Sequence, residues 1–407
     1  MQIYHRINKI LRKKRGIILI KAAKKMDKIP FSPIRRVFDE IAKLRAEGKS
    51  VISLGIGEPN FDTPKHIIDA MTKAAENGET HYTANKGILP LRKAIIKYLE
   101  QYDLHYDVEE IICTVGVAEA IFMVFEAYLD PGDEVLVPDP AWVNYANVPV
   151  LKDAVSVPYV MHAENNFQID VEGLEDLVTE KTKILVLINP SNPVGSVQSE
   201  ETIKKLADFA IKHDLLVISD EIYDQLIYDG KKHFSIASLP GMRERTVVLN
   251  GFSKSYAMTG WRLGYAAAPI ELIPPMAKAH AYMVTNATSM AQFGAVAALE
   301  GPQDFVGEMR DEFEKRRNYI VDAIRSMPLL DCNMPEGAFY VFVDVSKTGM
   351  NGEEFVNFMI HNGVGMVPGT AFGKSAEHFV RISYAASMEE IEECMRRLRK
   401  ALETLEK

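Results

Sequence analysis

Five short apolar runs, separated by stretches with helical periodicity, constrain the fold of this chain most. The runs are EEIICTV, DEVLVPD, KILVLIN, LLVISD and RTVVLNG, and none of them alternates apolar with polar residues. Strands have this pattern when both faces of their sheet are buried, because neither face then needs polar side chains. A helical segment such as SEETIKKLADFAIKHD, with Ser199 as its expected N-cap, lies between two of them. The alternation predicts an α/β fold with a parallel sheet covered by helices.

The pattern changes after about residue 300. A long charged helix, a strand pair near AFYVFVDV and a final helix follow there. The final helix repeats apolar residues at helical spacing, which indicates a core face: Met388, Ile391, Met395, Leu398, Leu402 and Leu405. We therefore expect a basic extension at 1–28, an N-terminal segment of a small domain at 29–59, a large domain at 60–300 and the small C-terminal domain at 301–407.

Composition excludes several classes of protein. The chain has 407 residues, 47% hydrophobic and 25% charged, as soluble globular proteins do, and no apolar run is long enough to span a bilayer. Its net charge is −9. Because residues 1–28 are strongly basic, the remainder of the chain is strongly acidic, which argues against broad nucleic-acid binding. We expect the basic extension to lie outside the fold, with Met26 as a candidate start.

The cysteines and histidines give no sign of a metal site. The three cysteines form no CxxC pair, and the ten histidines include no HExxH or paired spacing, so no metal is expected. Widely separated cysteines without a disulfide framework favour a reducing compartment, and we expect a cytoplasmic protein.

Chemically useful side chains follow each apolar run. Ligands of open parallel sheets bind beyond the carboxyl ends of the strands, so residues at those ends are candidates for one site. Each alone has a structural explanation, such as a turn asparagine or a capping aspartate, but their common position at one edge favours a site. The candidates in chain order are Gly116, Val117, Ala118, Trp142, Asn192, Asp220, Tyr223, Ser253 and Lys254.

These side chains suit an aromatic cofactor that carries an aldehyde and a phosphate. Lys254 can form a Schiff base with a carbonyl, and Asp220 can keep a ring nitrogen protonated so that the ring accepts electrons. Trp142 can stack on the ring. The helix N-terminus at Gly116 and the guanidinium of Arg262 can bind the phosphate. Together they describe pyridoxal 5'-phosphate (PLP).

From about residue 30 to its end the chain resembles the fold-type I, class I/II aminotransferases, and within them the microbial aspartate and aromatic subgroup. The motifs that carry the resemblance occur in order: GIGEPNFDTP, HYTANKGILPLR, NPSNPVG, SDEIYD, NGFSKSYAMTGWRLGY, PEGAFYVF, VPGTAFG and VRISYA. The resemblance implies a large PLP-binding domain with a mostly parallel seven-stranded sheet and a smaller α+β domain built from the N- and C-terminal segments. It also implies a homodimer with shared active sites.

The resemblance assigns roles to individual positions. Lys254, as the Schiff-base lysine, would be catalytic together with Asp220 and Tyr223. The implied cofactor ligands are Gly116, Val117, Ala118, Trp142, Asn192, Asp220, Tyr223, Ser253, Lys254 and Arg262, with Tyr82 from the neighbouring subunit. The implied substrate ligands are Gly57, Trp142, Asn192 and Arg381, and Arg381 would grip the α-carboxylate as a bidentate pair.

Two departures from the family pattern concern the site. Val194 stands where the motif NPxNPTG has threonine, and Ala118 stands where dicarboxylate-specific members often have lysine. Ile34, in the segment expected to cover the substrate side chain, is apolar, while its neighbour Arg35 could supply a charge. These features argue against a preference for aspartate and favour neutral or aromatic side chains within the range of aromatic, neutral and aspartate or glutamate donors that the resemblance implies.

The activity expected from the resemblance is transamination between an L-amino acid and a 2-oxo acid such as 2-oxoglutarate, by a ping-pong Schiff-base mechanism. A PLP-dependent lyase that catalyses β-elimination is an alternative, because the same lysine and ring serve both reactions. A transcription regulator on the same fold is a third reading, but 28 residues cannot hold a winged helix-turn-helix.

Overall fold

The computed structural model describes residues 21–31 and 33–405. Residues 1–20 of the expected basic extension lie outside the described residues. Residues 21–28 are exposed and include the 3-10 helix η1 (Lys24–Lys28), where Lys28 forms an ion pair of 2.9 Å with Asp153. No helix in the described ranges has the length and apolar character needed to cross a membrane.

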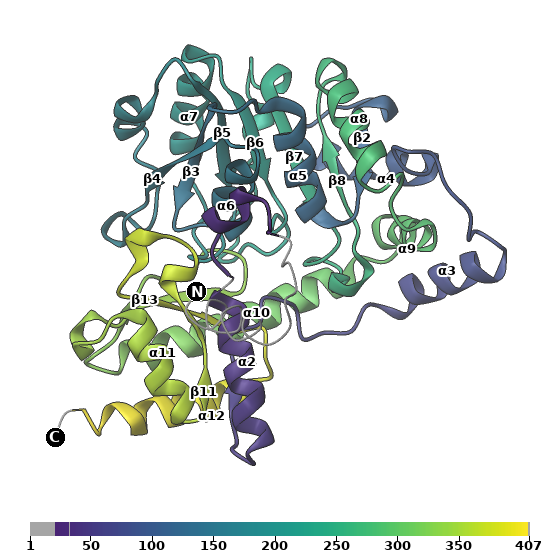
Figure 1. Ribbon diagram of the computed structural model, residues 1–407. Coiled ribbons are helices and arrows are strands. Elements are labelled where there is room, and N and C mark those ends of the chain that lie inside the picture. Colours follow the sequence, from purple (N-terminus) through teal and green to yellow (C-terminus); the bar gives the residue numbers. More distant parts are fainter. Residues whose placement is uncertain (1–20, 32, 406–407) are drawn as a thin grey trace, which may run out of the picture.

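A seven-stranded sheet forms the larger part of the molecule (Figure 1). Its strand order is β2-β8-β7-β6-β5-β3-β4, and all neighbours run parallel except the two pairs that include β8. The predicted α/β class and mostly parallel seven-stranded sheet are thus confirmed. The strands are β2 (Ile111–Thr114), β3 (Glu134–Asp139), β4 (Val155–Val160), β5 (Thr182–Ile188), β6 (Leu216–Asp220), β7 (Thr246–Gly251) and β8 (Gly264–Ala267).

Both faces of this sheet are buried, which explains the continuous apolar runs. In β5, Ile184 and Val186 pack into one apolar cluster, with α5, α6 and α8, while Leu185 and Leu187 pack into another, with α7. A third cluster joins β2, β7 and β8 to α4 and α9. The helices of this part are α3 (Lys65–Glu76), α4 (Leu89–Leu99), α5 (Gly116–Tyr128), α6 (Val143–Leu151), α7 (Glu200–Lys212), α8 (Ile273–Met283) and α9 (Ser289–Glu300).

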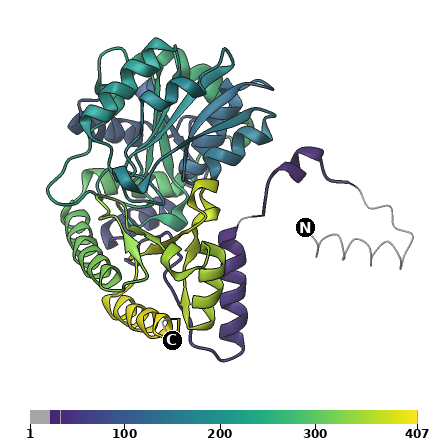
Figure 2. The same ribbon diagram turned by 90° about the vertical axis from the view of Figure 1, so that its left-hand side faces the viewer.

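A smaller α+β unit lies below the large sheet in Figure 1 and combines the two ends of the described chain. Helix α2, near the N-terminus, stands beside the C-terminal helices, and Figure 2 shows this neighbourhood from the side. The unit contains a four-stranded sheet and a parallel two-stranded sheet, β1-β11. Its elements are α2 (Pro33–Ala46), β1 (Ile52–Ser53), α10 (Asp304–Arg325), β9 (Asp331–Cys332), β10 (Tyr340–Asp344), α11 (Gly352–His361), β11 (Val364–Gly365), β12 (Val367–Pro368), β13 (Phe379–Ser383) and α12 (Met388–Leu402).

The local sequence signals for two helices are confirmed. Ser199 caps α7 by accepting a hydrogen bond of 3.0 Å from the Thr202 N–H. In α12, Ile391, Met395 and Leu398 are buried at the helical spacing that the sequence showed. Leu405 is half-buried against the same core but follows the last residue of the helix.

Two strands of the large sheet were not predicted. Strand β4 is an edge strand, and β8 lies inside the alanine-rich stretch LGYAAA, which carries little strand signal. Because β8 runs antiparallel to β7 and β2, its first residue lies at the edge where its neighbours end. A residue just before β8 therefore reaches the same edge as the residues that follow the parallel strands.

Candidate active site

A cavity of about 410 Å³ lies at this edge and is lined by residues of both the large and the small unit. Glu58, Ile56 and Tyr340 are among its lining residues that the sequence did not single out. The predicted site residues that line it are Gly57, Val117, Ala118, Trp142, Asn192, Asp220, Tyr223, Ser253, Lys254, Arg262 and Arg381. Gly116 lies against the guanidinium of Arg262, which a Cβ on this glycine would meet. Tyr82 does not line the cavity.

Lys254, in the loop after β7, points its amine into this cavity. The Nζ donates a hydrogen bond of 2.6 Å to the Gly57 carbonyl oxygen. Burial, together with the positive charges of Arg381 and Arg262, lowers the pKa of Lys254 to about 8. An appreciable minority of this amine is therefore neutral near physiological pH, as a nucleophile or a general base must be.

Asp220, the last residue of β6, is a buried carboxylate with only two protein donors among the described residues. The Tyr145 hydroxyl donates to its Oδ2 at 2.7 Å, and the Ile222 N–H donates to its Oδ1 at 3.2 Å. Burial raises the pKa of Asp220 to about 6, although the hydrogen bond from Tyr145 opposes the shift. The carboxyl can thus hold or release a proton close to neutral pH.

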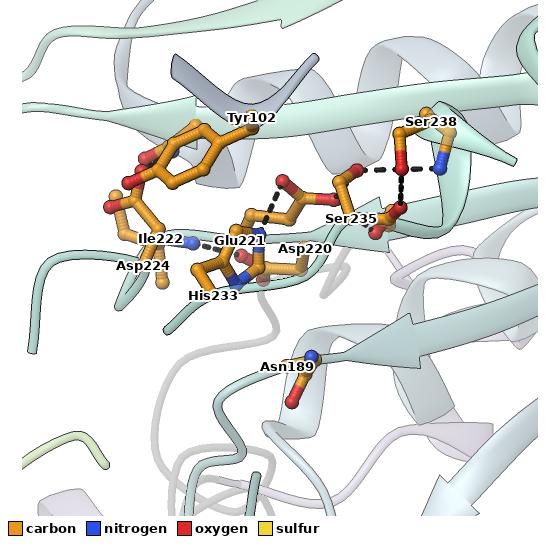
Figure 3. A network of polar contacts seen from close by, with 12 residues as sticks. Tyr102, Asn189, Asp220, Glu221, Ile222, Asp224, His233, Ser235 and Ser238 are labelled. Atoms are coloured by element: carbon orange, nitrogen blue, oxygen red, sulfur yellow. Dashed lines mark hydrogen bonds and ion pairs between the residues drawn. The ribbon is translucent and has the colours of Figure 1, made fainter. Parts of the chain in front are cut away.

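A buried polar network adjoins Asp220 (Figure 3). The side chain of Glu221 accepts hydrogen bonds from the hydroxyls of Ser219 and Ser235, at 2.7 and 2.6 Å, and contacts His233 at 2.8 Å. The carboxylate of Glu221 also contributes to the raised pKa of Asp220. This network fixes the backbone at the end of β6 and so the direction of the Asp220 side chain.

Arg381, on β13, is almost completely buried at 2% exposure. Its Nη1 donates to Asn192 Oδ1 at 2.9 Å, and its Nη2 donates to the Gly55 carbonyl oxygen at 2.8 Å. The guanidinium stacks between the rings of Tyr340 and Phe372, whose centroids lie 4.3 and 4.6 Å away. Its Nε is buried and has no hydrogen-bond partner among the residues that the structure describes. A fixed guanidinium with an unused donor suits a carboxylate ligand.

Tyr223 and Tyr340 form a pair on the same side of the cavity. Their hydroxyl oxygens are 2.9 Å apart, and burial raises the pKa of Tyr223 well above its usual value, so this phenol keeps its proton. Tyr340 also approaches Gly57, where a Cβ would lie 2.7 Å from the Tyr340 hydroxyl oxygen. Glycine at position 57 is therefore required for the close approach of this segment to the site.

The start of α5 and Arg262 form an anion cradle. Gly116 has a φ of +71°, and a Cβ there would lie 2.6 Å from Nη2 of Arg262. The guanidinium thus rests on the first turn of α5, where free N–H groups and the helix dipole favour an anion. Arg262 precedes β8 and has a φ of +55°, and its Nη1 donates to the Thr259 carbonyl oxygen at 2.8 Å.

Sequence reasoning missed Tyr145 and Tyr340. Tyr145 lies in AWVNY, one turn after Trp142, and a tyrosine inside an apolar helix looks like core. Tyr340 lies in PEGAFYVF, a motif that the sequence singled out without assigning a role to any residue in it. Only the fold brings their hydroxyls to Asp220 and Tyr223.

The structure also places the residues at which the sequence departs from the family pattern and those expected near the substrate side chain. Ala118 and Ile34 line the cavity, whereas Arg35 is exposed and does not line it. Val194 is buried in the apolar cluster beside α7, so the valine here packs as core. Tyr82 is 87% exposed, in the connection between α3 and α4.

Comparisons with known proteins agree with this geometry. The family model described as aminotransferase class I and II matches residues 49–398. An aspartate aminotransferase of Pyrococcus abyssi is 44% identical, over 93% of this chain and 97% of that protein. An aromatic-amino-acid aminotransferase of Thermococcus litoralis is 42% identical, over 91% and 95%. The crystal structure of the aspartate aminotransferase from Rhizobium meliloti has a TM-score of 0.91 and 36% identity, over 95% of this chain and 99% of that one.

The lowered pKa of Lys254 can be measured directly. In the protein without added ligands, acylation of Lys254 should follow a titration with a midpoint near pH 8, since only the neutral amine reacts. In Arg381→Met the midpoint should rise, because a neighbouring positive charge is gone, but burial should keep it below 10.5. Competitive acylation with peptide mass spectrometry gives both values. Exposed Lys205, whose pKa is raised, serves as the internal control, and equal midpoints for the two lysines would contradict the assignment.

Proposed function

The chain belongs to the class I and II aminotransferases, and we propose that it transfers the α-amino group of neutral and aromatic L-amino acids to a 2-oxo acid. PLP-dependent transamination is the activity of this enzyme, because the matching family is that of the class I and II aminotransferases and the relatives aligned over nearly the whole chain are aminotransferases. These relatives do not favour the lyase alternative. The observation that carries the proposal is Lys254, a buried amine of lowered pKa in one cavity with Asp220 and Arg381.

The residues of the cavity fit PLP. The cavity contains an amine for the aldehyde, a carboxyl for the ring nitrogen and an anion cradle beneath Arg262 for the phosphate. At Gly116 a side chain would occupy the space of the Arg262 guanidinium, so the glycine lets this cation lie against the first turn of α5, where an anion is favoured. We assign the phosphate to Gly116, Val117, Ala118, Ser253 and Arg262.

When bound, PLP supplies a conjugated ring that accepts the electron pair left on the substrate when its α-proton is removed. Asp220 holds the proton at the ring nitrogen, and Tyr145 holds Asp220 in place. Trp142 would cover one face of the ring, while Asn192 and Tyr223 would donate hydrogen bonds to its oxygen; all three line the cavity. Lys254 Nζ would take the α-proton of the substrate and hold it for the later transfer, which its lowered pKa permits.

We assign the substrate α-carboxylate to Arg381. Asn192 and Gly55 hold the guanidinium from one side, and the two flanking rings fix its plane. The carboxylate can then accept two parallel hydrogen bonds, a geometry that the single ammonium of a lysine cannot reproduce. Gly57 leaves room beside it.

Replacement of Lys254 tests the proposed reaction. Lys254→Ala should lower kcat by about a thousandfold or more, because it removes the group that moves the proton, while PLP still binds through the phosphate cradle. Product formation from phenylalanine and 2-oxoglutarate is followed by NMR, which separates phenylpyruvate plus glutamate from ammonia. Full activity of this variant, or ammonia without glutamate from the parent enzyme, would contradict the proposal. Arg381→Lys is the contrasting variant and should raise KM at least about tenfold.

Apolar side chains in the cavity support neutral or aromatic donors. Ile34 and Phe38 of α2, together with Ile56, line it, and the lining cations are Lys254, Arg262 and Arg381 among the described residues. Each of these cations already has a role above. None of them is therefore left to bind the side-chain carboxylate of a dicarboxylic substrate. Relatives named for aspartate and for aromatic amino acids are about equally identical to this chain, and so do not decide between them.

A cation placed at Ala118 should change this preference. Ala118→Lys should raise kcat/KM for aspartate by about tenfold and lower it for phenylalanine, because it adds a partner for a distal carboxylate. Ala118→Met, of similar length without charge, is the matched control and should not favour aspartate. The measurement is kcat/KM for both donors in the three proteins. A parent enzyme that prefers aspartate over every aromatic donor would refute the proposed preference.

We propose a homodimer in which Tyr82 reaches the cofactor phosphate of the second copy. Tyr82 and Tyr282 are 87% and 88% exposed, which is unusual for large aromatic side chains and is typical of surfaces that another chain covers. Tyr82 is not among the residues that line the cavity of its own chain.

The dimer has a direct test. Light scattering should give a mass near twice 45.6 kDa, and Tyr82→Phe should weaken PLP binding severalfold without changing that mass. A monomer with full PLP affinity would contradict the proposal, as would a dimer whose affinity does not depend on Tyr82.

We also propose the domain boundaries and the location expected from the sequence. Residues 60–300 supply Lys254 and Asp220, whereas residues 29–59 and 301–407 supply Gly57 and Arg381, so substrate contacts both units. Limited proteolysis that cleaves within these segments earlier than it cleaves at the boundaries between them would argue against the proposed boundaries. The three cysteines are buried and free, which supports the cytoplasm, and recovery of the native protein in a secreted fraction would argue against it.

A further inference from the structure

A buried histidine lies between the start of α5 and the loop that carries Tyr82. His280, on α8, has 0% exposure. Its Nδ1 is 2.6 Å from Oε1 of Glu119, in the first turn of α5. Its Nε2 is 2.9 Å from the carbonyl oxygen of Asn85. The ring thus connects three segments that are distant in sequence.

The partners of the ring fix its protons. A carbonyl oxygen only accepts, so Nε2 carries a proton and donates it to Asn85. The carboxyl of Glu119 faces Nδ1 with one oxygen, while its other oxygen accepts the Val115 N–H at 2.5 Å. A second proton therefore lies between Nδ1 and Glu119, and the buried pair carries no net charge. Without that proton a buried carboxylate would stand unpaired in the turn that receives an anion.

On one side this bridge holds the cradle. Val115 is the residue before α5, and Gly116 follows it with the positive φ on which Arg262 rests. Glu119 ties the Val115 N–H to the first turn of the helix and is itself held by His280. The direction of the free N–H groups at Gly116 and Val117 depends on that tie.

On the other side the bridge holds the loop of Tyr82. Asn85 accepts from His280 with its backbone and donates with Nδ2 to the Thr285 carbonyl oxygen at 2.7 Å. Gln292, fully buried, donates to Thr83 Oγ1 at 3.1 Å and accepts from the Ile88 N–H at 2.7 Å. The loop is therefore fastened to α8 and α9, close to the residues that hold the cradle.

We propose that the Glu119–His280–Asn85 bridge is a positioning unit for phosphate binding. It holds the start of α5 for the cofactor phosphate of its own subunit and the Tyr82 loop for that of the second copy. The proposal rests on the function proposed above. His280 and Glu119 line no part of the cavity and act only through Val115 and Asn85.

The test compares PLP with pyridoxal, which lacks the phosphate. His280→Phe puts a somewhat larger apolar ring in place of the imidazole and removes both hydrogen bonds. It should raise the dissociation constant of PLP by about tenfold or more and change that of pyridoxal by less than about twofold. Both constants are measured by absorbance titration of the cofactor-depleted full-length protein. A loss of the same size for both ligands, or no loss for PLP, overturns the proposal.

Two further variants keep the test decisive. In Glu119→Gln the new amide can donate to Nδ1 and accept from Val115, so the bridge persists and PLP affinity should stay within about threefold. If this variant loses as much affinity as His280→Phe, the bridge is not what positions the phosphate. His213→Phe removes the histidine that follows α7 and pairs with Glu175, neither of which lines the cavity, and should leave both constants unchanged.

The outcomes also separate this inference from the proposed function. If the parent protein binds neither PLP nor pyridoxal at Lys254, the proposed function fails. If the parent binds PLP and all three variants match it, only the bridge fails. Should His280→Phe not fold, as its melting temperature reveals, His280→Gln takes its place. It retains one donor and should lose PLP affinity to a smaller extent, again without a comparable loss for pyridoxal.

Discussion

The crowding of three cationic side chains into one cavity is the constraint on which the rest of the site depends. Lys254, Arg262 and Arg381 all line it, and only Glu58 and Asp220 oppose them among the lining residues that the structure describes. Like charges and burial disfavour a protonated lysine, which is why the pKa of Lys254 falls. The two anions proposed to bind here, a phosphate and a carboxylate, would offset this positive charge. The same crowding thus creates a reactive amine and affinity for anionic ligands.

Sheet topology explains how distant residues meet there. Parallel strands deliver Trp142, Asn192, Asp220 and Lys254 to one edge, and the antiparallel β8 brings Arg262 to that edge from the opposite direction. The small unit closes the cavity with Arg381. A hydrogen bond joins the small unit to the large one. Asp139, at the end of β3, accepts it at 2.6 Å from the hydroxyl of Ser375, which precedes β13 in the chain.

Much of this could be predicted from the sequence, for physical reasons. The five apolar runs identify buried strands because both sheet faces are covered, and residues after such strands must share an edge. What escaped prediction depends on packing between distant segments. A buried tyrosine such as Tyr145 or a histidine such as His280 reads as core until the fold shows what its polar atoms contact. Strand β8 escaped because its glycine and alanines carry no strand propensity.

The central claim is that Lys254 and its cavity perform the first half of a transamination. An absorption spectrum of the purified enzyme with PLP, recorded before and after addition of a single amino acid without any 2-oxo acid, tests it most directly. The account predicts that the visible band of the bound cofactor disappears with phenylalanine and returns when 2-oxoglutarate is added. A protein that shows no such band with PLP, or whose band no amino acid changes, would contradict the account.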